Sequence, residues 1–263
     1  MKYLIDADFL EKNLDNYYII DLRSMEEYSI SHVQGAVLSP SNIHFTDENH
    51  NLIKTNDFLI LMGRLGINNY TNIIVYDSNL NKTSCIFWYM MHHYGHKGEI
   101  LILNGGYSEV ENNDNIPKQN TYNIPPLTSY TPKITENYVY YLNDLIKNYD
   151  KVKILDTRSS AEWDKQTYYN NPRMGNLPGA IFLDFSKFLT TKDGYYKIYN
   201  STALELEAEN LGLEKEDLIV TYCQHGARAA LAGIALRTLG YKNVIIYEGS
   251  MYEWSRNISL ALE

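Results

Sequence analysis

One cysteine of this sequence stands where a reactive thiol can do chemistry. Cys223 opens the run Cys-Gln-His-Gly-Ala-Arg (residues 223–228), directly after the apolar segment 218–222 and shortly before a helix-forming segment that begins at Ala229. A thiol between a strand and a helix faces free backbone N–H groups and the positive end of the helix dipole. Both favour the thiolate, which is the nucleophilic form of cysteine. The pattern predicts that Cys223 is a catalytic nucleophile.

A buried, inert cysteine is the alternative interpretation, because an unpaired cysteine is most often a small apolar side chain of the core. Gly226 favours the reactive interpretation, since glycine lets the backbone turn sharply between strand and helix. Cys85 lies in an apolar helical run, Thr-Ser-Cys-Ile-Phe-Trp, and we expect it in the core. The two cysteines form no Cys-x-x-Cys pair, so we expect no disulfide framework, no metal site and no cofactor.

Composition and charge limit the classes of partner. The chain has 263 residues, of which 44% are hydrophobic, and its formal net charge is −9. This is enough for one large or two ordinary packed domains. The charge argues against nucleic acid or an anionic membrane as a partner, although local N–H groups can still bind a small anion. The sequence has no signal-peptide pattern and no long apolar run, so we expect a soluble, cytoplasmic protein.

An internal repeat divides the chain into two halves. Matching segments follow one another in the same order, at offsets between 135 and 146 residues. The clearest pairs are 19–24 with 154–159, 33–36 with 177–180, and 73–77 with 219–223. Between the halves, residues 116–132 are rich in Asn, Pro and Thr and lack apolar periodicity, which is typical of a linker. The sequence therefore predicts an N-terminal domain over 1–115 and a C-terminal domain over 133–263.

Short apolar runs alternate with amphipathic stretches in each half. In the second half we expect strands at 152–155, 218–222 and 244–247, and helices at 204–211 and 229–239. Short buried strands separated by helices are typical of a parallel sheet. The predicted fold class is α/β, with two similar domains that are each a parallel sheet flanked by helices.

Four segments of the second half carry a family resemblance. They are Leu-Asp-Thr-Arg-Ser-Ser-Ala-Glu-Trp (155–163), Gly-Asn-Leu-Pro-Gly-Ala (175–180), the cysteine run (223–228) and Tyr-Glu-Gly-Ser-Met-Tyr-Glu-Trp (247–254). Together they resemble the rhodanese domain. Weaker copies stand at 21–28, 32–36 and 104–107, so the whole chain resembles a tandem-domain thiosulfate sulfurtransferase. The first half has Asp77 at the position of Cys223, and the resemblance therefore implies two rhodanese-like domains of which only the C-terminal one is catalytic.

The resemblance also implies a ping-pong sulfur transfer. Cys223 attacks the outer sulfur of a small anionic donor such as thiosulfate, and its persulfide then passes the sulfur to cyanide, a thiol or a sulfur-accepting protein. The implied substrate-binding residues are Gln224, His225, Gly226, Ala227, Arg228, Arg158 and Arg173, with Asp156 in support.

These residues carry different expectations. Main-chain N–H groups of residues 224–228 would stabilise the thiolate and the persulfide. Gln224 is a candidate donor of a neutral hydrogen bond, and His225 either binds the sulfonate end as imidazolium or is a solvated loop histidine. Arg228 either anchors the loop or holds the anion.

The remaining candidates lie outside the cysteine run. We expect Asp156 and Arg158 to pair and hold the loops, with direct substrate contact by Arg158 as the alternative. Arg173 resembles a substrate-anion arginine of two-domain members.

Three other functions stay open. Mercaptopyruvate sulfurtransferases share the fold and the thiol, but their loop typically reads Cys-Gly-Ser-Gly-Val-Thr. Related cysteine phosphatases place five residues between the cysteine and the arginine, whereas four stand between Cys223 and Arg228. Non-enzymatic regulatory modules usually lose the cysteine. The sequence thus favours thiosulfate as the donor.

Overall fold

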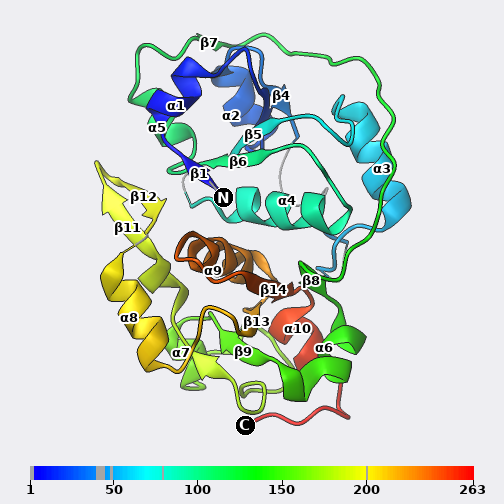
Figure 1. The fold of residues 1–263 in the computed structure, drawn as a ribbon, viewed down its shortest axis with the longest axis vertical. Coiled ribbons are helices and arrows are strands. Elements are labelled where there is room, and N and C mark those ends of the chain that lie inside the picture. Colours follow the sequence, from blue (N-terminus) through cyan, green and yellow to red (C-terminus); the bar gives the residue numbers. More distant parts are fainter. Residues whose placement is uncertain (1–2, 40–44, 48–49, 79, 200) are drawn as a thin grey trace. The chain divides into compact units, whose positions relative to one another are not determined.

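The computed structural model describes residues 3–39, 45–47, 50–78, 80–199 and 201–263 (Figure 1). The chain forms two compact units, and neither is one continuous stretch of sequence. Unit 1 comprises Met1–Asp47, Leu52–Thr135 and Thr191–Lys197, and unit 2 comprises Glu48–Asn51, Glu136–Thr190 and Ile198–Glu263.

Within the described residues, unit 1 is built on a five-stranded parallel sheet with the order β1-β6-β5-β2-β4. Its strands are β1 (Leu4–Ile5), β2 (Tyr18–Asp21), β4 (Val37–Leu38), β5 (Ile73–Tyr76) and β6 (Ile100–Leu103). Its helices are α1 (Ala7–Lys12), α2 (Met25–Ile30), α3 (Thr55–Arg64), α4 (Lys82–His93) and α5 (Tyr107–Glu111). Every residue of β5 and β6 is buried, which explains why both read as unbroken apolar runs.

Unit 2 repeats this arrangement with the strand order β10-β9-β13-β14-β8. Its strands are β8 (Val139–Tyr140), β9 (Lys153–Asp156), β10 (Ile181–Phe182), β13 (Leu218–Tyr222) and β14 (Asn243–Tyr247). Its helices are α6 (Leu142–Asn148), α7 (Ser160–Trp163), α8 (Thr202–Asn210), α9 (Ala227–Thr238) and α10 (Ser250–Arg256), with short 3-10 turns at Tyr149–Lys151 and Phe185–Phe188. The two sheets correspond strand by strand, which confirms the predicted α/β class and the duplication.

Helices cover both faces of each sheet (Figure 1). In unit 1, side chains of α1 and α5 share one apolar cluster with alternate residues of the strands, and α4 lies on the other side of the sheet. In unit 2, α6 and α10 contribute to the corresponding cluster, while α9 packs on β13 and β14. Because a central parallel sheet is buried on both faces, the loops at the carboxyl ends of its strands are where side chains can reach a ligand.

The segment 116–132, which the sequence predicts as a linker, runs along unit 1. Its strand β7 (Lys118–Gln119) pairs antiparallel with β3 (His32–Val33). Farther on, Asn123 Nδ2 donates a hydrogen bond of 2.8 Å to the Ala36 carbonyl. The proline-rich composition therefore gives an extended segment that hydrogen-bonds to the surface of the unit.

A hairpin from the second half of the sequence contributes to unit 1. Its strands are β11 (Leu189–Lys192) and β12 (Tyr195–Ile198). Lys197 Nζ lies 2.6 Å from Glu109 Oε1, the Tyr195 hydroxyl donates to the same oxygen, and the Ala7 N–H donates to Oε2 at 3.3 Å. The buried Glu109 carboxylate is thus satisfied partly by residues that lie far along the chain.

A buried network fixes the carboxyl end of β9 in unit 2. Arg158 donates from Nε and Nη2 to both oxygens of Asp156, with a shortest distance of 2.6 Å, and both side chains are buried. The Tyr222 hydroxyl donates to Asp156 Oδ2 at 2.5 Å and accepts the Leu177 N–H at 3.2 Å. Burial raises the pKa of Tyr222 well above its ordinary value, so the hydroxyl keeps its proton and remains a donor.

Unit 1 contains the same network. Arg23 pairs with Asp21 at 2.7 Å, and the Tyr76 hydroxyl donates to Asp21 Oδ2 at 2.7 Å while it accepts the Val33 N–H at 3.3 Å. Asp21 lies beside Tyr76 in the sheet register, as Asp156 lies beside Tyr222. A tyrosine that ends the central strand therefore ties together the neighbouring strand and the next loop in both units.

Removal of either tyrosine hydroxyl tests this network. In Tyr222→Phe the buried Asp156 oxygen and the Leu177 N–H lose a partner, so we expect a loss of about 1–3 kcal/mol of unfolding free energy. Tyr76→Phe should cost a similar amount. Urea denaturation measures both, with exposed Tyr196→Phe as the control that stays close to wild type. Unchanged midpoints in the first two variants would contradict the assigned role.

Candidate active site

Cys223 lies in a tight loop between β13 and α9. Its side chain is a free thiol and 1% exposed. The loop ends at Gly226, which has φ of +81° and caps the N-terminus of α9. A Cβ at Gly226 would lie 3.3 Å from the Glu248 carbonyl oxygen, so both conformation and space favour glycine here.

The start of α10 holds this loop in place. Ser250 Oγ accepts hydrogen bonds of 3.2 Å from the N–H groups of both Cys223 and Gly226. In return, the Met251 and Tyr252 N–H groups donate to the carbonyls of residues 223 and 224, at 3.0 and 3.1 Å. Ser250 itself adopts a left-handed conformation with φ of +48°. The loop backbone is therefore pinned at both ends to the neighbouring helix.

Several N–H groups around the thiol remain without a protein acceptor. Among the residues that the structure describes, none accepts a hydrogen bond from the N–H of residues 224, 225 or 227–229. The last three belong to the first turn of a twelve-residue helix. Such groups carry a partial positive charge and bind anions. Together with the thiol they form a site suited to a thiolate, a persulfide or an anionic donor.

The corresponding place in unit 1 is filled by the protein itself. Asp77 follows β5 as Cys223 follows β13, and its carboxylate is buried. It accepts N–H groups from Asn81 at 3.0 Å, Thr83 at 2.9 Å and Ser84 at 3.2 Å, at the beginning of α4. Burial raises the pKa of Asp77 above its ordinary value, although these N–H groups oppose the shift. Unit 1 thus offers neither a thiol nor these N–H groups to an outside anion.

Arg228 anchors the loop through an ion pair. Its two Nη atoms donate to both oxygens of Glu162 at 2.6 and 2.9 Å, in the paired geometry that arginine favours. Glu162 also accepts the Ser159 N–H and hydroxyl and so caps α7. Burial alone would raise the pKa of Glu162, but the bond from Arg228 lowers it. Of the two expectations for Arg228, this geometry favours the anchor.

Arg158 and Arg173 are also committed to the protein. Arg158 pairs with Asp156 and further donates to the Gly175 carbonyl and to Asn176 Oδ1. Arg173 donates to four backbone carbonyls near the C-terminus, at 2.6–2.9 Å; the acceptors are residues 254, 255, 257 and 260. Geometry therefore favours a role for both arginines in holding loops, whereas the sequence expects substrate contacts of Arg173.

The sequence suggests that the Gln224 side chain donates a hydrogen bond to the sulfur donor, but in the structure this side chain is bonded within the protein. Its side chain is 3% exposed and exchanges two hydrogen bonds with Asn171, at 2.7 and 2.9 Å. Both functional groups of the amide are therefore engaged within the protein.

His225 lies in a cluster of basic and aromatic side chains at the surface of the loop. Its ring centroid is 4.0 Å from that of His50 and 5.4 Å from that of Tyr252. Arg256 stacks on the Tyr252 ring at 3.6 Å. Burial, together with the positive charges nearby, lowers the pKa of His225 to about 4. The lowered pKa favours a neutral His225 at neutral pH, which argues against the imidazolium that was one of the two expectations from the sequence.

Several residues of the site are not evident from the sequence. Glu162 has an equivalent in the first half, Glu27, and this repetition is a sequence signal that the position matters. The bond from Arg228 to Glu162 cannot be read from the sequence, because it spans 66 residues. Ser250 and Asn171 reach the loop from 27 and 53 residues away. His50 belongs to a stretch of the first half that forms part of unit 2.

Two other kinds of feature, a membrane-spanning helix and a metal site, are absent from the part of the chain that the structure describes. No described helix is long and apolar enough to cross a membrane. No group of three or more His, Cys, Asp or Glu side chains among the described residues could hold a metal ion.

The duplicated sheets and the thiol loop define a tandem-domain α/β protein with one cysteine site. Residues 6–113 and 139–257 both match the family model of the rhodanese-like domain. The chain belongs to the rhodanese-like family.

Related proteins extend along the whole chain. A relative from Haloferax volcanii, with the provisional name thiosulfate sulfurtransferase, is 28% identical over 280 residues, which cover 99% of this chain and 96% of the relative. The 3-mercaptopyruvate sulfurtransferase of Escherichia coli is 26% identical over 281 residues, covering 99% of this chain and 98% of its own. A crystal structure of the Escherichia coli protein SseA, described under 3-mercaptopyruvate sulfotransferases, has a TM-score of 0.79 at 24% identity. That match covers 95% of this chain and 99% of the other.

The lowered pKa of His225 has a measurable consequence for stability. The folded protein favours the neutral ring, so this contribution is present above the ordinary pKa of 6.5 and is lost as the pH falls toward 4. We expect wild type to lose more unfolding free energy over this range than His225→Gln. Denaturation at several pH values measures the difference, and NMR should place the titration midpoint of His225 near 4. Equal pH profiles, or a midpoint above 6.5, would refute this assignment.

Proposed function

We propose that this protein is a sulfurtransferase that moves the outer sulfur of thiosulfate to a thiophilic acceptor through a persulfide of Cys223. The observation that carries the proposal is the pairing of a thiol with N–H groups that lack an acceptor among the described residues of the protein. In unit 1 the carboxylate of Asp77 occupies such groups. Catalysis then belongs to the C-terminal domain (133–263), while the N-terminal domain (1–115) is non-catalytic and 116–132 joins them.

The first half-reaction loads the enzyme. The Cys223 thiolate attacks the outer sulfur of thiosulfate, a new S–S bond forms, and the bond between the two thiosulfate sulfurs breaks. Sulfite leaves with the bonding electron pair, so no oxidant or reductant is needed. N–H groups of the loop and of the first turn of α9 bind the donor and then stabilise the negative outer sulfur of the persulfide.

In the second half-reaction the transferred sulfur leaves Cys223 for the acceptor. Cyanide, a thiolate or a sulfur-accepting protein attacks the outer sulfur of the persulfide, and the Cys223 thiolate leaves. Splitting one transfer into two steps lets donor and acceptor use the same small site in turn. Persulfide chemistry of this kind requires no metal or cofactor.

The charged residues of the proposed site act mainly by holding the loops around Cys223 in position. Arg228 holds the loop through Glu162, and its positive charge lies close enough to Cys223 to interact with it electrostatically. Asp156 and Arg158 fix the adjoining loops. His225 lies at the surface of the loop as a neutral ring, where it can donate to or accept from a substrate. Direct contact with the donor thus falls to the backbone N–H groups of residues 224, 225 and 227–229, because the Gly226 N–H is bonded to Ser250.

The second candidate donor is 3-mercaptopyruvate. It is favoured by the likeness to the Escherichia coli sulfurtransferase of that name. The loop Gln-His-Gly-Ala-Arg after Cys223 differs from the Gly-Ser-Gly-Val-Thr typical of that class, so thiosulfate remains the preferred donor.

Intact-mass measurement tests the proposal directly. After incubation with thiosulfate, the protein should gain the mass of one sulfur atom, and Cys223→Ser should gain none. Cyanide added to the loaded protein should remove the sulfur and release thiocyanate. Cys85→Ser is the matched control, because Cys85 is buried in α4, and it should load like wild type. Absence of a mass gain in wild type would refute the proposed function.

Turnover with different donors separates the remaining candidates. We expect thiosulfate to give a higher kcat/KM than 3-mercaptopyruvate, with no release of phosphate from an aryl phosphate. Preference for 3-mercaptopyruvate would retain the Cys223 mechanism and change the donor. Phosphate release that depends on Cys223 would instead identify a phosphatase.

A further inference from the structure

The second half of the chain carries an insertion beside the cysteine loop. Leu177 stands fourteen positions after Trp163, whereas Val33 stands five positions after Tyr28, the equivalent of Trp163. The second half is therefore nine residues longer at this point. We infer that this insertion is a latch that holds Gln224, and with it the cysteine loop, through Asn171. Asn171 is then a positioning residue for sulfur transfer, an assignment that rests on the proposed function.

The contact between Asn171 and Gln224 is reciprocal. Asn171 Nδ2 donates to Gln224 Oε1 at 2.9 Å, and Gln224 Nε2 donates to Asn171 Oδ1 at 2.7 Å. The side chains are 4% and 3% exposed. Two buried amides that satisfy each other have a defined relative orientation, since loss of Asn171 removes both hydrogen bonds that the buried Gln224 amide makes with it.

A second layer of contacts supports this pair. The Gln224 carbonyl accepts the Tyr252 N–H at 3.1 Å, so the residue is held by its backbone as well as its side chain. Arg256 Nη1 donates to the Tyr252 carbonyl at 2.8 Å and lies 3.4 Å from Asn171 Oδ1. Helix α10 and the insertion thus meet at the residue that follows Cys223.

The insertion is itself held in a specific conformation. Lys165, Tyr169 and Asn170 have φ between +44° and +60°, a left-handed backbone that non-glycine residues adopt only when their surroundings enforce it. At its C-terminal end, Arg173 binds the carbonyls of residues 254, 255, 257 and 260, and Arg158 binds the Gly175 carbonyl. These bonds from Arg158 and Arg173 fix the segment that presents Asn171.

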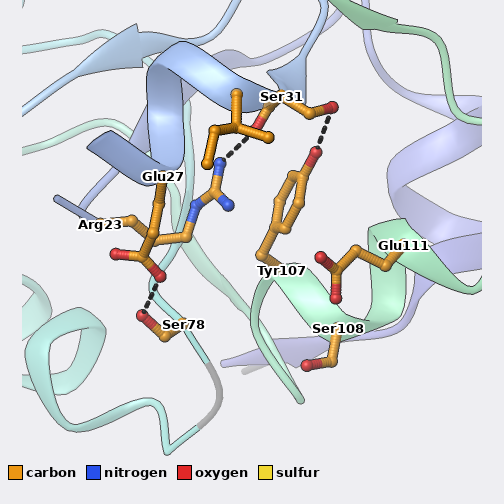
Figure 2. A pocket seen from close by; sticks show the side chains of 8 residues that line it. Arg23, Glu27, Ser31, Ser78, Tyr107, Ser108 and Glu111 are labelled. Carbon is orange, nitrogen blue, oxygen red and sulfur yellow. Dashed lines mark hydrogen bonds between the residues drawn. The ribbon is translucent and has the colours of Figure 1, made fainter. Parts of the chain in front are cut away.

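Unit 1 serves as an internal control for this inference. Ser78 follows Asp77 as Gln224 follows Cys223, but the short connection between α2 and β4 supplies no counterpart of Asn171. The space beside Ser78 is instead an open pocket of about 230 Å³. Figure 2 shows Glu27 and Ser78 on one side of this pocket and Ser108 and Glu111 on the other. The half without the thiol therefore also lacks the latch.

The contact between Asn171 and Gln224 affects the sulfur-transfer step, because it orders the N–H groups that stabilise negative charge on the transferred sulfur. Orientation of the Gln224 side chain restricts the backbone at residues 224 and 225, whose N–H groups have no acceptor in the part of the chain that the structure describes. Donors fixed before the reaction stabilise the transition state more than flexible ones. Loss of Asn171 should therefore lower kcat more than it raises KM.

The experiment compares three variants with wild type in thiosulfate:cyanide turnover. Asn171→Ala should lower kcat about tenfold or more, with KM changed by less than about threefold. The exchanged pair Asn171→Gln with Gln224→Asn keeps two amides of the same combined length and should recover most of the loss. Gln166→Ala removes an exposed amide of the same insertion and should match wild type. Hydrogen exchange at the Gly226 N–H, which is bonded to Ser250, should be faster in Asn171→Ala alone.

The outcomes separate the latch from a general loss of stability and from the proposed function. Wild-type kcat in Asn171→Ala, or a loss that the exchanged pair does not recover, would overturn the latch. A rise in KM with kcat unchanged would overturn it as well, because that result indicates lost substrate binding. If wild type gains no sulfur, the proposed function fails, and exchange at Gly226 then decides by itself whether Asn171 holds the loop.

Discussion

The N–H groups in the first turn of a helix have no acceptor within the helix itself. The two units are built alike around such a turn and differ in what these N–H groups bind. In each unit a buried central strand, β5 or β13, is followed within a few residues by a helix, α4 or α9. In unit 1 the carboxylate of Asp77 accepts three of these N–H groups. In unit 2 the thiol of Cys223 is too short and too weak an acceptor to do so, and the N–H groups remain available to an anion.

Both units contain the same buried network at the strand ends, and it supports the loop whether the loop carries a carboxylate or a thiol. An aspartate, an arginine and a tyrosine bind one another at the strand ends in both units, with distances that agree within a few tenths of an ångström. This network sets the position of the loop regardless of what the loop contains. Under the proposed function, duplication separates the parts that build the site from the parts that do chemistry, and the latter are confined to Cys223 and its immediate surroundings.

Much of the fold could be predicted because its signals are local. The strand Leu218–Tyr222 and the helices after it are evident from apolar runs, and the repeat extends the same interpretation to the first half. The cysteine loop was recognisable for the same reason, since strand, glycine and helix are adjacent in sequence. Pairing between distant side chains carries no such pattern: Ser250, Asn171 and His50 reach the loop only through tertiary structure.

Charge was the least predictable property. Arg173 and His225 are residue types that bind anions, and type alone suggests that role. In the structure Arg173 is occupied by backbone carbonyls, and burial beside other positive charges keeps His225 neutral. Whether a basic side chain is available to a ligand depends on its other partners, which a single sequence does not reveal.

The composition of unit 1 has a consequence for how the chain is made. Its buried Glu109 is partnered by Tyr195 and Lys197, which a ribosome adds only midway through synthesis of the second half. The first unit to begin folding therefore cannot be completed until synthesis of the second unit is well under way. Until residue 197 emerges, the Glu109 carboxylate near the start of α1 lacks its lysine, and completion of unit 1 is linked to synthesis of the second half of the chain.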